Sequence, residues 1–102
     1  MATTPALSQE VDAAVWAIEA EADFLPELAE LWDREHPASK ATWVSEWDVL
    51  VSRLAGLDEA CRAGAMTAAQ RERYRTLRAT LSTRLPLLAR LGLPLPAVPP
   101  AE

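Results

Sequence analysis

The residues of this 102-residue chain that could do chemistry are one histidine, one cysteine and several carboxylates near the histidine. Asp33 and His36 form an Asp-x-x-His pair, and Glu27 and Glu30 precede it at helical spacing. A carboxylate-bridged dimetal bundle needs a second histidine motif, and a zinc site needs several His or Cys ligands. We therefore expect no metal and no other cofactor, and we expect His36 to lie at a helix end beside the last carbonyl groups.

The sequence also lacks the residue pattern of a catalytic centre. Its five serines fall at predicted helix caps or on polar faces, and no glycine-rich phosphate loop is present. Glu19 and Asp23, four residues apart, are typical of a solvated helix face. Cys61 falls on an apolar seam, where a free cysteine packs as a small hydrophobic side chain. We therefore expect a protein without enzymatic activity.

The elements that position these residues are predicted most clearly by the apolar seam in the middle of the chain. Its members recur at intervals of four, three, four, three and four residues: Trp43, Trp47, Leu50, Leu54, Leu57 and Cys61. This spacing predicts a helix over about 40–63, with Ser39 or Thr42 as its N-cap. Gly64 is expected to close the helix in a left-handed conformation. Gly56 either allows close approach of another helix or is simply tolerated.

A second long helix is predicted over about 67–85. Thr67 and Gln70 form a capping box at its start. The helix should bend or end near Thr83–Leu85, because Pro86 cannot donate a backbone hydrogen bond. Its apolar stripe consists of Tyr74, Leu77, Leu81, Leu85 and Leu88. The connection over residues 63–66 is so short that the two helices should lie antiparallel as neighbours.

The connecting turn also resembles a known hinge. Residues 62–70 are similar to the Gly-apolar-Thr-x-x-Glu hinge of many short bacterial oligomerisation helices. A glycine C-cap followed by a capping box is sufficient to explain that pattern. The resemblance therefore implies a local structure and no particular function.

An N-terminal helix is predicted over about 7–35. Its main stripe consists of Leu7, Val11, Ala14, Ile18, Leu25 and Trp32. Pro26 should either kink the helix or separate two shorter helices, the second capped by Asp23. His36-Pro37 marks its end, because a residue before proline is disfavoured in the α region.

Together these elements predict an all-α, antiparallel three-helix bundle. Residues 1–92 form a single helical domain, and residues 93–102, with four prolines, form an extended tail. The chain opens with no signal-peptide pattern, and no apolar run approaches the length of a membrane span. We therefore expect a cytoplasmic protein that does not enter a membrane.

Charge is distributed unevenly along the chain. Residues 1–36 carry nine acidic residues and one basic residue, whereas residues 65–102 carry six arginines and two acidic residues. The first interpretation is that the N-terminal helix lies beside the third helix. Opposite charges would then pair along the two edges of the third helix's leucine stripe, which we term its shoulders. One shoulder carries Arg71, Arg75 and Arg78, and the other carries Arg73 and Arg84. The same pairing could form between the two chains of a dimer.

A second apolar side of the N-terminal helix gives the main hypothesis about function. Ala13, Trp16, Ala17, Ala20 and Phe24 lie away from the main stripe. An apolar helix of this kind is usually buried on both sides. We expect a protein interface made by Trp16, Ala20 and Phe24, with Glu19, Asp23, Arg71, Arg75 and Arg78 setting the orientation. Two alternatives would leave no such interface. Either a bend at Pro26 lets the chain cover both apolar sides of the N-terminal helix, or Trp16 packs under the Leu93–Val98 tail.

The sequence thus predicts a small protein-interaction or oligomerisation module. Its partner would be a second copy, giving a homodimer, or another cytoplasmic protein that it serves as an accessory subunit. The alternative is a nucleic-acid-binding regulator, antitoxin-like, that uses the arginines of the third helix. The sequence pI of about 4.8 argues against that alternative, because affinity for DNA comes largely from neutralising phosphates. Trp32, Trp43 and Trp47 could line a small ligand pocket, but filling the core is the favoured interpretation.

Overall fold

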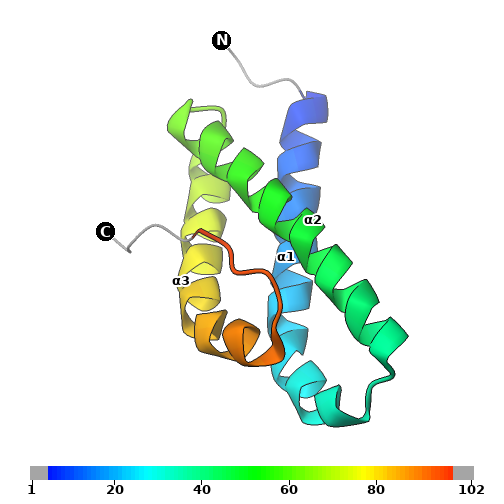
Figure 1. Ribbon diagram of the computed structural model, residues 1–102. Coiled ribbons are helices and arrows are strands. Elements are labelled where there is room, and N and C mark those ends of the chain that lie inside the picture. Colours follow the sequence, from blue (N-terminus) through cyan, green and yellow to red (C-terminus); the bar gives the residue numbers. More distant parts are fainter. Residues whose placement is uncertain (1–4, 98–102) are drawn as a thin grey trace.

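The computed structural model describes residues 5–97, with the side chains of residues 8–97. Within these residues the protein consists of three packed helices and no strand, which confirms the predicted all-α three-helix bundle (Figure 1). Helix α1 spans Pro5–Leu31, α2 spans Pro37–Arg62 and α3 spans Ala68–Leu91, and the short 3-10 turn η1 spans Trp32–Arg34. In the described part of the tail, residues 93–97 form no regular secondary structure.

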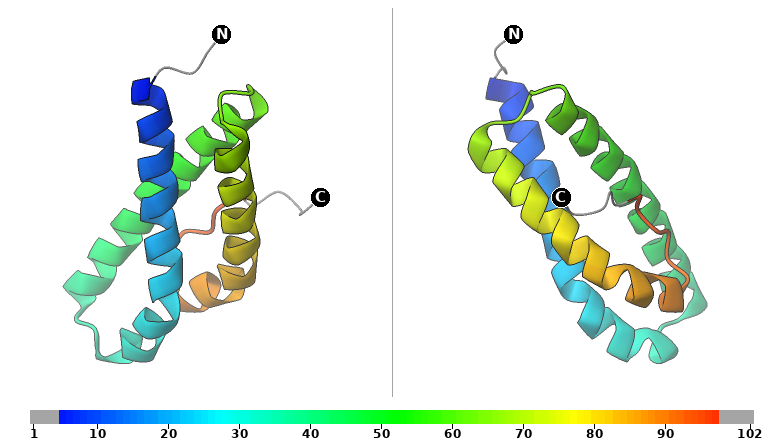
Figure 2. Two further views of the ribbon diagram at one scale, coloured as in Figure 1. Left: turned by 180° about the vertical axis from the view of Figure 1, so that it is seen from behind. Right: turned by 90° about the vertical axis from the view of Figure 1, so that its left-hand side faces the viewer.

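Helix α1 is the central element of the bundle. It packs along α3 and is crossed by α2 (Figures 1 and 2). Helices α2 and α3 run antiparallel but splay apart from their connecting turn, and their backbones approach each other much less than either approaches α1. The prediction that they are close neighbours was therefore wrong along most of their length. The described part of the tail runs back between them (Figure 1).

Helix α1 continues through Pro26 as one helix, so of the two predicted outcomes the division into two shorter helices is wrong. Proline at position 26 leaves the carbonyl of Ala22 without its normal helical donor. The Arg84 side chain of α3 donates Nε–H to that carbonyl oxygen, at 3.2 Å. A hydrogen bond from a neighbouring helix thus replaces the missing backbone bond. The helix ends at Leu31, and the 3-10 turn η1 occupies most of the predicted last turn.

The start of α2 differs from the prediction in its capping residue. The Nδ1 atom of His36 accepts a hydrogen bond from the backbone N–H of Ala38, at 3.0 Å, and Pro37 is the first helical residue. A proline at this position is favourable because its fixed φ suits the helix and its missing N–H is not needed. The predicted caps, Ser39 and Thr42, lie inside the helix. His36 therefore begins a helix rather than ending one.

The turn into α3 has the predicted geometry. Gly64 adopts a left-handed conformation with φ of 73°. Thr67 Oγ1 accepts from the N–H of Gln70 at 3.1 Å, and Gln70 Oε1 accepts from the N–H of Thr67 at 2.9 Å. The Gln70 side chain is buried, and its Nε2 also donates to the Ser8 carbonyl oxygen and to Asp12 Oδ1. The capping box thereby fastens the beginning of α3 to the beginning of α1.

Helix α3 extends through Pro86 to Leu91, beyond the predicted end at residue 85. Its last turns bend away from the axis of the preceding ones (Figure 1). The bend is the predicted effect of Pro86, but the helix continues because Leu88 and Leu91 are buried in the core. Gly92, with φ of 72°, then ends the helix in a left-handed conformation.

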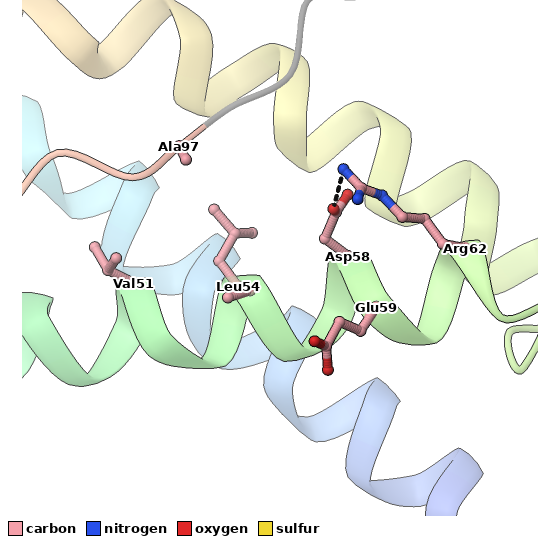
Figure 3. A pocket seen from close by; sticks show the side chains of 7 residues that line it. Val51, Leu54, Asp58, Glu59, Arg62 and Ala97 are labelled. Atoms are coloured by element: carbon pink, nitrogen blue, oxygen red, sulfur yellow. Dashed lines mark ion pairs between the residues drawn. The ribbon is translucent and has the colours of Figure 1, made fainter.

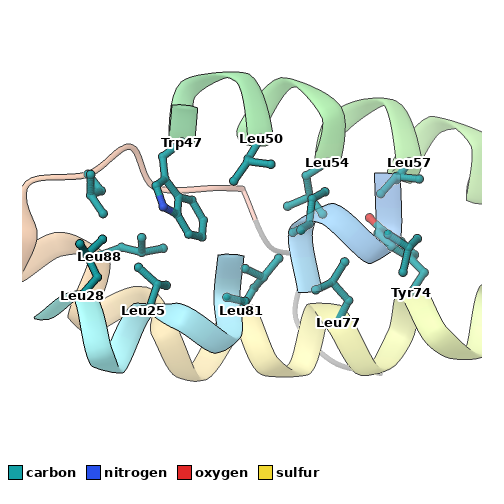
Figure 4. Close-up of a cluster of buried hydrophobic side chains, with 14 of the residues drawn as sticks. Leu25, Leu28, Trp47, Leu50, Leu54, Leu57, Tyr74, Leu77, Leu81 and Leu88 are labelled. Carbon is teal, nitrogen blue, oxygen red and sulfur yellow. The ribbon is translucent and has the colours of Figure 1, made fainter. Parts of the chain in front are cut away.

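The core lies between one face of each helix and the start of the tail (Figure 4). Buried residues of α1 are Val11, Val15, Ile18, Ala22, Leu25 and Leu28; those of α2 are Trp47, Leu50, Leu54 and Leu57. From α3 come Tyr74, Leu77, Leu81, Leu88 and Leu91, and the tail adds Leu93. Most of the predicted stripes are therefore confirmed, although Ala14, Trp32, Trp43, Cys61 and Leu85 are only partly buried. The side chain of Leu7 lies outside the described residues.

Candidate functional site

Trp16 is the most prominent exposed apolar side chain in the described part of the chain. It belongs to α1, the helix nearest the viewer in the left view of Figure 2. Its side chain is 68% exposed. Val49 of α2, also exposed, lines the same cleft as Trp16. A tryptophan left in solvent beside a second apolar side chain is typical of a binding surface.

The cleft between the two helices, which we term the α1–α2 groove, extends along both of them. Its first part has a volume of about 450 Å³ and is lined by Trp16, Ala17, Ala20, Glu21, Glu46, Val49, Leu50 and Arg53. The second part shares Arg53 and continues along Glu10, Val11, Ala13, Ala14, Gly56, Leu57 and Ala60. Many of these side chains are small, so a bound chain could approach the two helices closely.

Gly56 lines the α1–α2 groove and does not pack against another helix inside the bundle. A Cβ atom built on Gly56 would meet no heavy atom within 4 Å. The glycine is therefore not required for close approach of another helix within the described chain. Of the two interpretations drawn from the sequence, the structure supports the one in which Gly56 is tolerated.

A second cleft lies on the other side of Trp16, between α1 and α3. It is lined by Trp16, Glu19, Ala20, Asp23, Thr76, Leu77 and Thr80. Trp16 and Ala20 thus separate two clefts, and both residues are exposed. The tail runs between α2 and α3 and leaves Trp16 uncovered, so the alternative in which the tail covers this side chain does not hold for the described residues.

Phe24, the third apolar residue of the predicted interface, is placed differently. Its ring stacks on that of Trp43, with 5.7 Å between the ring centroids. This contact half-buries Phe24 within the chain, next to the core. The apolar part of the candidate surface therefore consists of Trp16, Ala20 and Val49. The sequence pattern of α1 singles out the first two, but it could not identify Val49, which belongs to α2.

The charged residues of the predicted interface fall into separate places. Glu19 forms an ion pair with Arg73 of α3, with 2.6 Å between the charged atoms, and Asp23 is exposed beside the α1–α3 cleft. Pairing between α1 and α3 was the first interpretation of the charge distribution, and this ion pair confirms it for Arg73. Arg84, on the same shoulder, donates to the backbone carbonyl of Ala22 instead.

On the other arginine shoulder of α3, the side chains of Arg75 and Arg78 make contacts within α3. Arg71 is exposed, and Arg75 pairs with Glu72 at 3.4 Å. The guanidinium carbon of Arg78 lies 5.3 Å from the centre of the Tyr74 ring. These three arginines are therefore not brought together with Trp16 by the fold.

Glu21 is the electrostatically unusual residue of the α1–α2 groove. Burial, and then repulsion from Glu46, raise the pKa of its carboxyl group above the usual range. Its Oε2 atom is buried without a hydrogen-bond partner in the described part of the chain. The groove thus contains a carboxylate oxygen that lacks a donor and lies beside a second acidic residue.

A further cleft lies where the described tail ends, on the opposite side of α2 (Figure 3). Val51, Leu54 and Ala97 form its apolar part. Its polar end is a network: Arg62 pairs with Asp58 at 2.8 Å, and the Tyr74 hydroxyl donates to Asp58 at 3.1 Å. Burial and the hydrogen bond to Asp58 raise the pKa of Tyr74. The network holds α2 to α3 near their connecting turn.

The residues considered first for chemistry are dispersed. His36 caps α2, and Cys61 is partly buried at the edge of the core. Trp47 fills the core, Trp43 stacks on Phe24, and Lys40 Nζ lies 5.4 Å from the centre of the Trp32 ring. Across residues 5–97, no three His, Cys, Asp or Glu side chains are grouped so as to hold a metal ion.

None of the described helices combines the length and the apolar character needed to cross a membrane. Comparisons of the chain with models of protein families, with curated proteins and with solved structures gave no match.

Proposed function

We propose that this chain is a small protein-interaction module that binds its partner through the exposed Trp16 and the α1–α2 groove, without catalysing a reaction. The observation that supports this proposal is the 68% exposure of Trp16, which lines the α1–α2 groove together with Val49. Covering the rest of the indole would contribute on the order of 2–3 kcal/mol, which is enough for one residue to anchor an interface.

The partner is a second copy, which would make the protein a homodimer, or another protein of the cytoplasm. In either form, Trp16 and Ala20 provide the apolar contact. Asp23 and Glu21 lie beside them and would influence the orientation of the partner. The ion pair between Glu19 and Arg73 would keep the surface of α1 in place during binding.

The nucleic-acid alternative has one favourable observation, the exposure of Arg71 and Arg75 on one side of α3. Arg75 is already paired with Glu72, and the nine acidic residues of positions 1–36 would repel a phosphate backbone. Retention of the protein on duplex DNA at physiological salt would favour this alternative over the first.

The first experiment measures the mass of the protein in solution by light scattering on a sizing column, in low and high salt. Wild type is compared with Trp16→Ser, which removes the apolar anchor from the surface. A dimer that persists in high salt and is lost in the variant would support self-association through this face. A dimer unaffected by the variant would place the interface elsewhere and contradict the proposal.

A second experiment covers the case in which the protein is a monomer. A photo-crosslinking amino acid is introduced at position 16, and the control carries the same group at the exposed position 59, on the other side of α2. Irradiation in the cells of origin should give a defined protein adduct from position 16 only. Equal labelling at the two positions would show that the Trp16 face is not a binding surface.

A further inference from the structure

The α1–α2 groove has a chemical character that specifies the kind of partner it fits. We propose that it receives a cationic amphipathic helix from a different protein, with the apolar side of that helix on Trp16 and Val49 and a Lys or Arg side chain between Glu21 and Glu46. This inference rests on the proposed function, since it assumes that the Trp16 face is the binding surface.

Charge around the groove is the first argument. Glu10, Glu21 and Glu46 line it, and Arg53 is the basic residue between its two parts. On the other side of Trp16, Asp23 adds a further negative charge. A second copy would bring an equally acidic surface against this one, whereas a basic partner would match it.

The buried oxygen of Glu21 is the second argument. Oε2 is shielded from solvent and has no hydrogen-bond partner in the described part of the chain, so no internal donor offsets the charge of this carboxyl group beside Glu46. A docked side chain would act on the carboxyl group as a whole and not by reaching Oε2. A Lys or Arg side chain is the donor that two neighbouring carboxylates bind most strongly, because the hydrogen bond is charge-assisted. Such a donor would also offset the repulsion between Glu21 and Glu46.

The length and floor of the groove are the third argument. From Glu46 to Ala60 along α2, the lining residues span about 21 Å at 1.5 Å per residue, which matches about four turns of a docked helix. Ala13, Ala17 and Gly56 present little side chain, so the axis of that helix could lie close to α1 and α2.

The test uses two synthetic 14-residue amphipathic helices without tryptophan, one of Leu and Lys and the other of Leu and Glu. Binding to the full chain is measured by the tryptophan emission, which should shift to shorter wavelength as Trp16 leaves the solvent. The Leu/Lys peptide should bind, and the Leu/Glu peptide should not. Equal binding of the two peptides would overturn the inference.

Variants with matched charge identify the site. Glu21→Gln combined with Glu46→Gln should weaken binding of the Leu/Lys peptide about tenfold, since the charge-assisted contacts are lost. The control, Glu59→Gln combined with Glu72→Gln, removes the same charge from other exposed positions and should change binding less than about twofold. An equal loss in the two double variants would mean general attraction to an acidic protein and would overturn the inference.

Arg53→Gln provides a result that poor folding could not imitate. Removing this positive charge from the groove should strengthen binding of the Leu/Lys peptide about threefold. Unchanged or weaker binding in this variant would contradict the inference. If no peptide binds but Trp16→Ser dissociates a homodimer, the proposed function holds and the cationic partner does not. If Trp16→Ser alters neither peptide binding nor self-association, both proposals fail.

Discussion

At the scale of single residues, the most informative contact is the one between Arg84 and the backbone of α1. Arg84 Nε donates to the Ala22 carbonyl oxygen that Pro26 leaves without a helical donor. One side chain of α3 therefore compensates for a proline in the middle of α1. A hydrogen bond from a charged donor contributes about 1.5–3 kcal/mol when its acceptor is shielded from water.

Arg84→Met should accordingly lower the free energy of unfolding by about 1–2 kcal/mol, because the Ala22 carbonyl loses its donor. Urea denaturation measures the change. Arg71→Met, the same substitution at an exposed position of α3, should stay within about 0.5 kcal/mol of wild type.

A double-mutant cycle with Pro26→Ala separates this contact from other roles of Arg84. Alanine at position 26 supplies the N–H that proline lacks, so Arg84→Met should cost clearly less in that background. An equal cost in both backgrounds would show that Arg84 does not act through the Ala22 carbonyl.

Tyr74 makes a second prediction at the residue scale. Its pKa is raised from the usual value near 10, first by burial and then by the hydrogen bond to Asp58. The unfolded chain therefore releases the phenolic proton at a lower pH than the folded chain does. The contribution of Tyr74 to stability is complete below pH 10 and is lost progressively as the pH rises above it.

We expect the free energy of unfolding to fall between pH 10 and 11 by on the order of 1 kcal/mol. Tyr74 is the only tyrosine in the sequence, so Tyr74→Phe should remove most of this dependence, although it also loses the hydrogen bond to Asp58. Chemical denaturation at pH 8 and pH 11 measures both proteins. An equal fall in the variant would assign the alkaline effect to another group.

At the scale of secondary-structure elements, two glycines of similar sequence surroundings have opposite roles. Gly56 is helical and its missing Cβ would meet nothing within 4 Å, whereas Gly64 has φ of 73°. Gly56→Ala should raise the free energy of unfolding by about 0.5–1 kcal/mol, because alanine restricts the unfolded chain and suits a helix.

Gly64→Ala is the matched comparison and should lower the free energy of unfolding by about 1 kcal/mol, because a Cβ atom is strained at positive φ. Thermal melts followed by circular dichroism give both values. A destabilising Gly56→Ala would mean that position 56 is packed more closely than the structure describes.

The elements that sequence could predict are those whose signals are local. Gly64 and the capping box of Thr67 and Gln70 were predicted because all their partners lie within a few residues. The seam of α2 was predicted because its spacing is regular. The hydrogen bond that supports α1 at Pro26 was not predicted, because its donor, Arg84, lies 62 residues from the carbonyl it binds.

The candidate site was predicted in part for the same reason. Trp16 and Ala20 stand out from the pattern of α1 alone, and their role in binding stays a prediction. Val49 and Glu46 could not be added, because only the way α2 crosses α1 brings them to the groove. Phe24 was grouped with Trp16 by helical position, yet its stacking partner Trp43 belongs to another helix.

At the scale of the whole molecule, the tail is part of the bundle. Leu93 is 4% exposed and belongs to the core, whereas Leu95 is 53% exposed. The described tail segment lies between the splayed helices α2 and α3 and covers apolar side chains that these helices do not cover for each other (Figures 1 and 4). The absence of helix in the described tail was predicted, whereas its place between α2 and α3 was not.

Leu93→Ala should lower the free energy of unfolding by about 2–4 kcal/mol, since it leaves a cavity between α2 and α3. Leu95→Ala, the same change two residues later, should cost less than about 0.5 kcal/mol. Urea denaturation distinguishes the two. Similar small effects at both positions would show that the tail is not needed to close the core.

The splayed arrangement of α2 and α3 has a consequence for folding kinetics. Helices α2 and α3 follow each other in the chain but touch least, while the main helix interface joins α1 to α3, with Gln70 bonded to Ser8 across 62 residues. Folding must therefore close a long loop before it gains its principal contacts, which is slow for a helical protein. The rate-limiting nucleus should include Ile18 and Leu77 rather than the Gly64 turn, so changes at that turn would mainly accelerate unfolding.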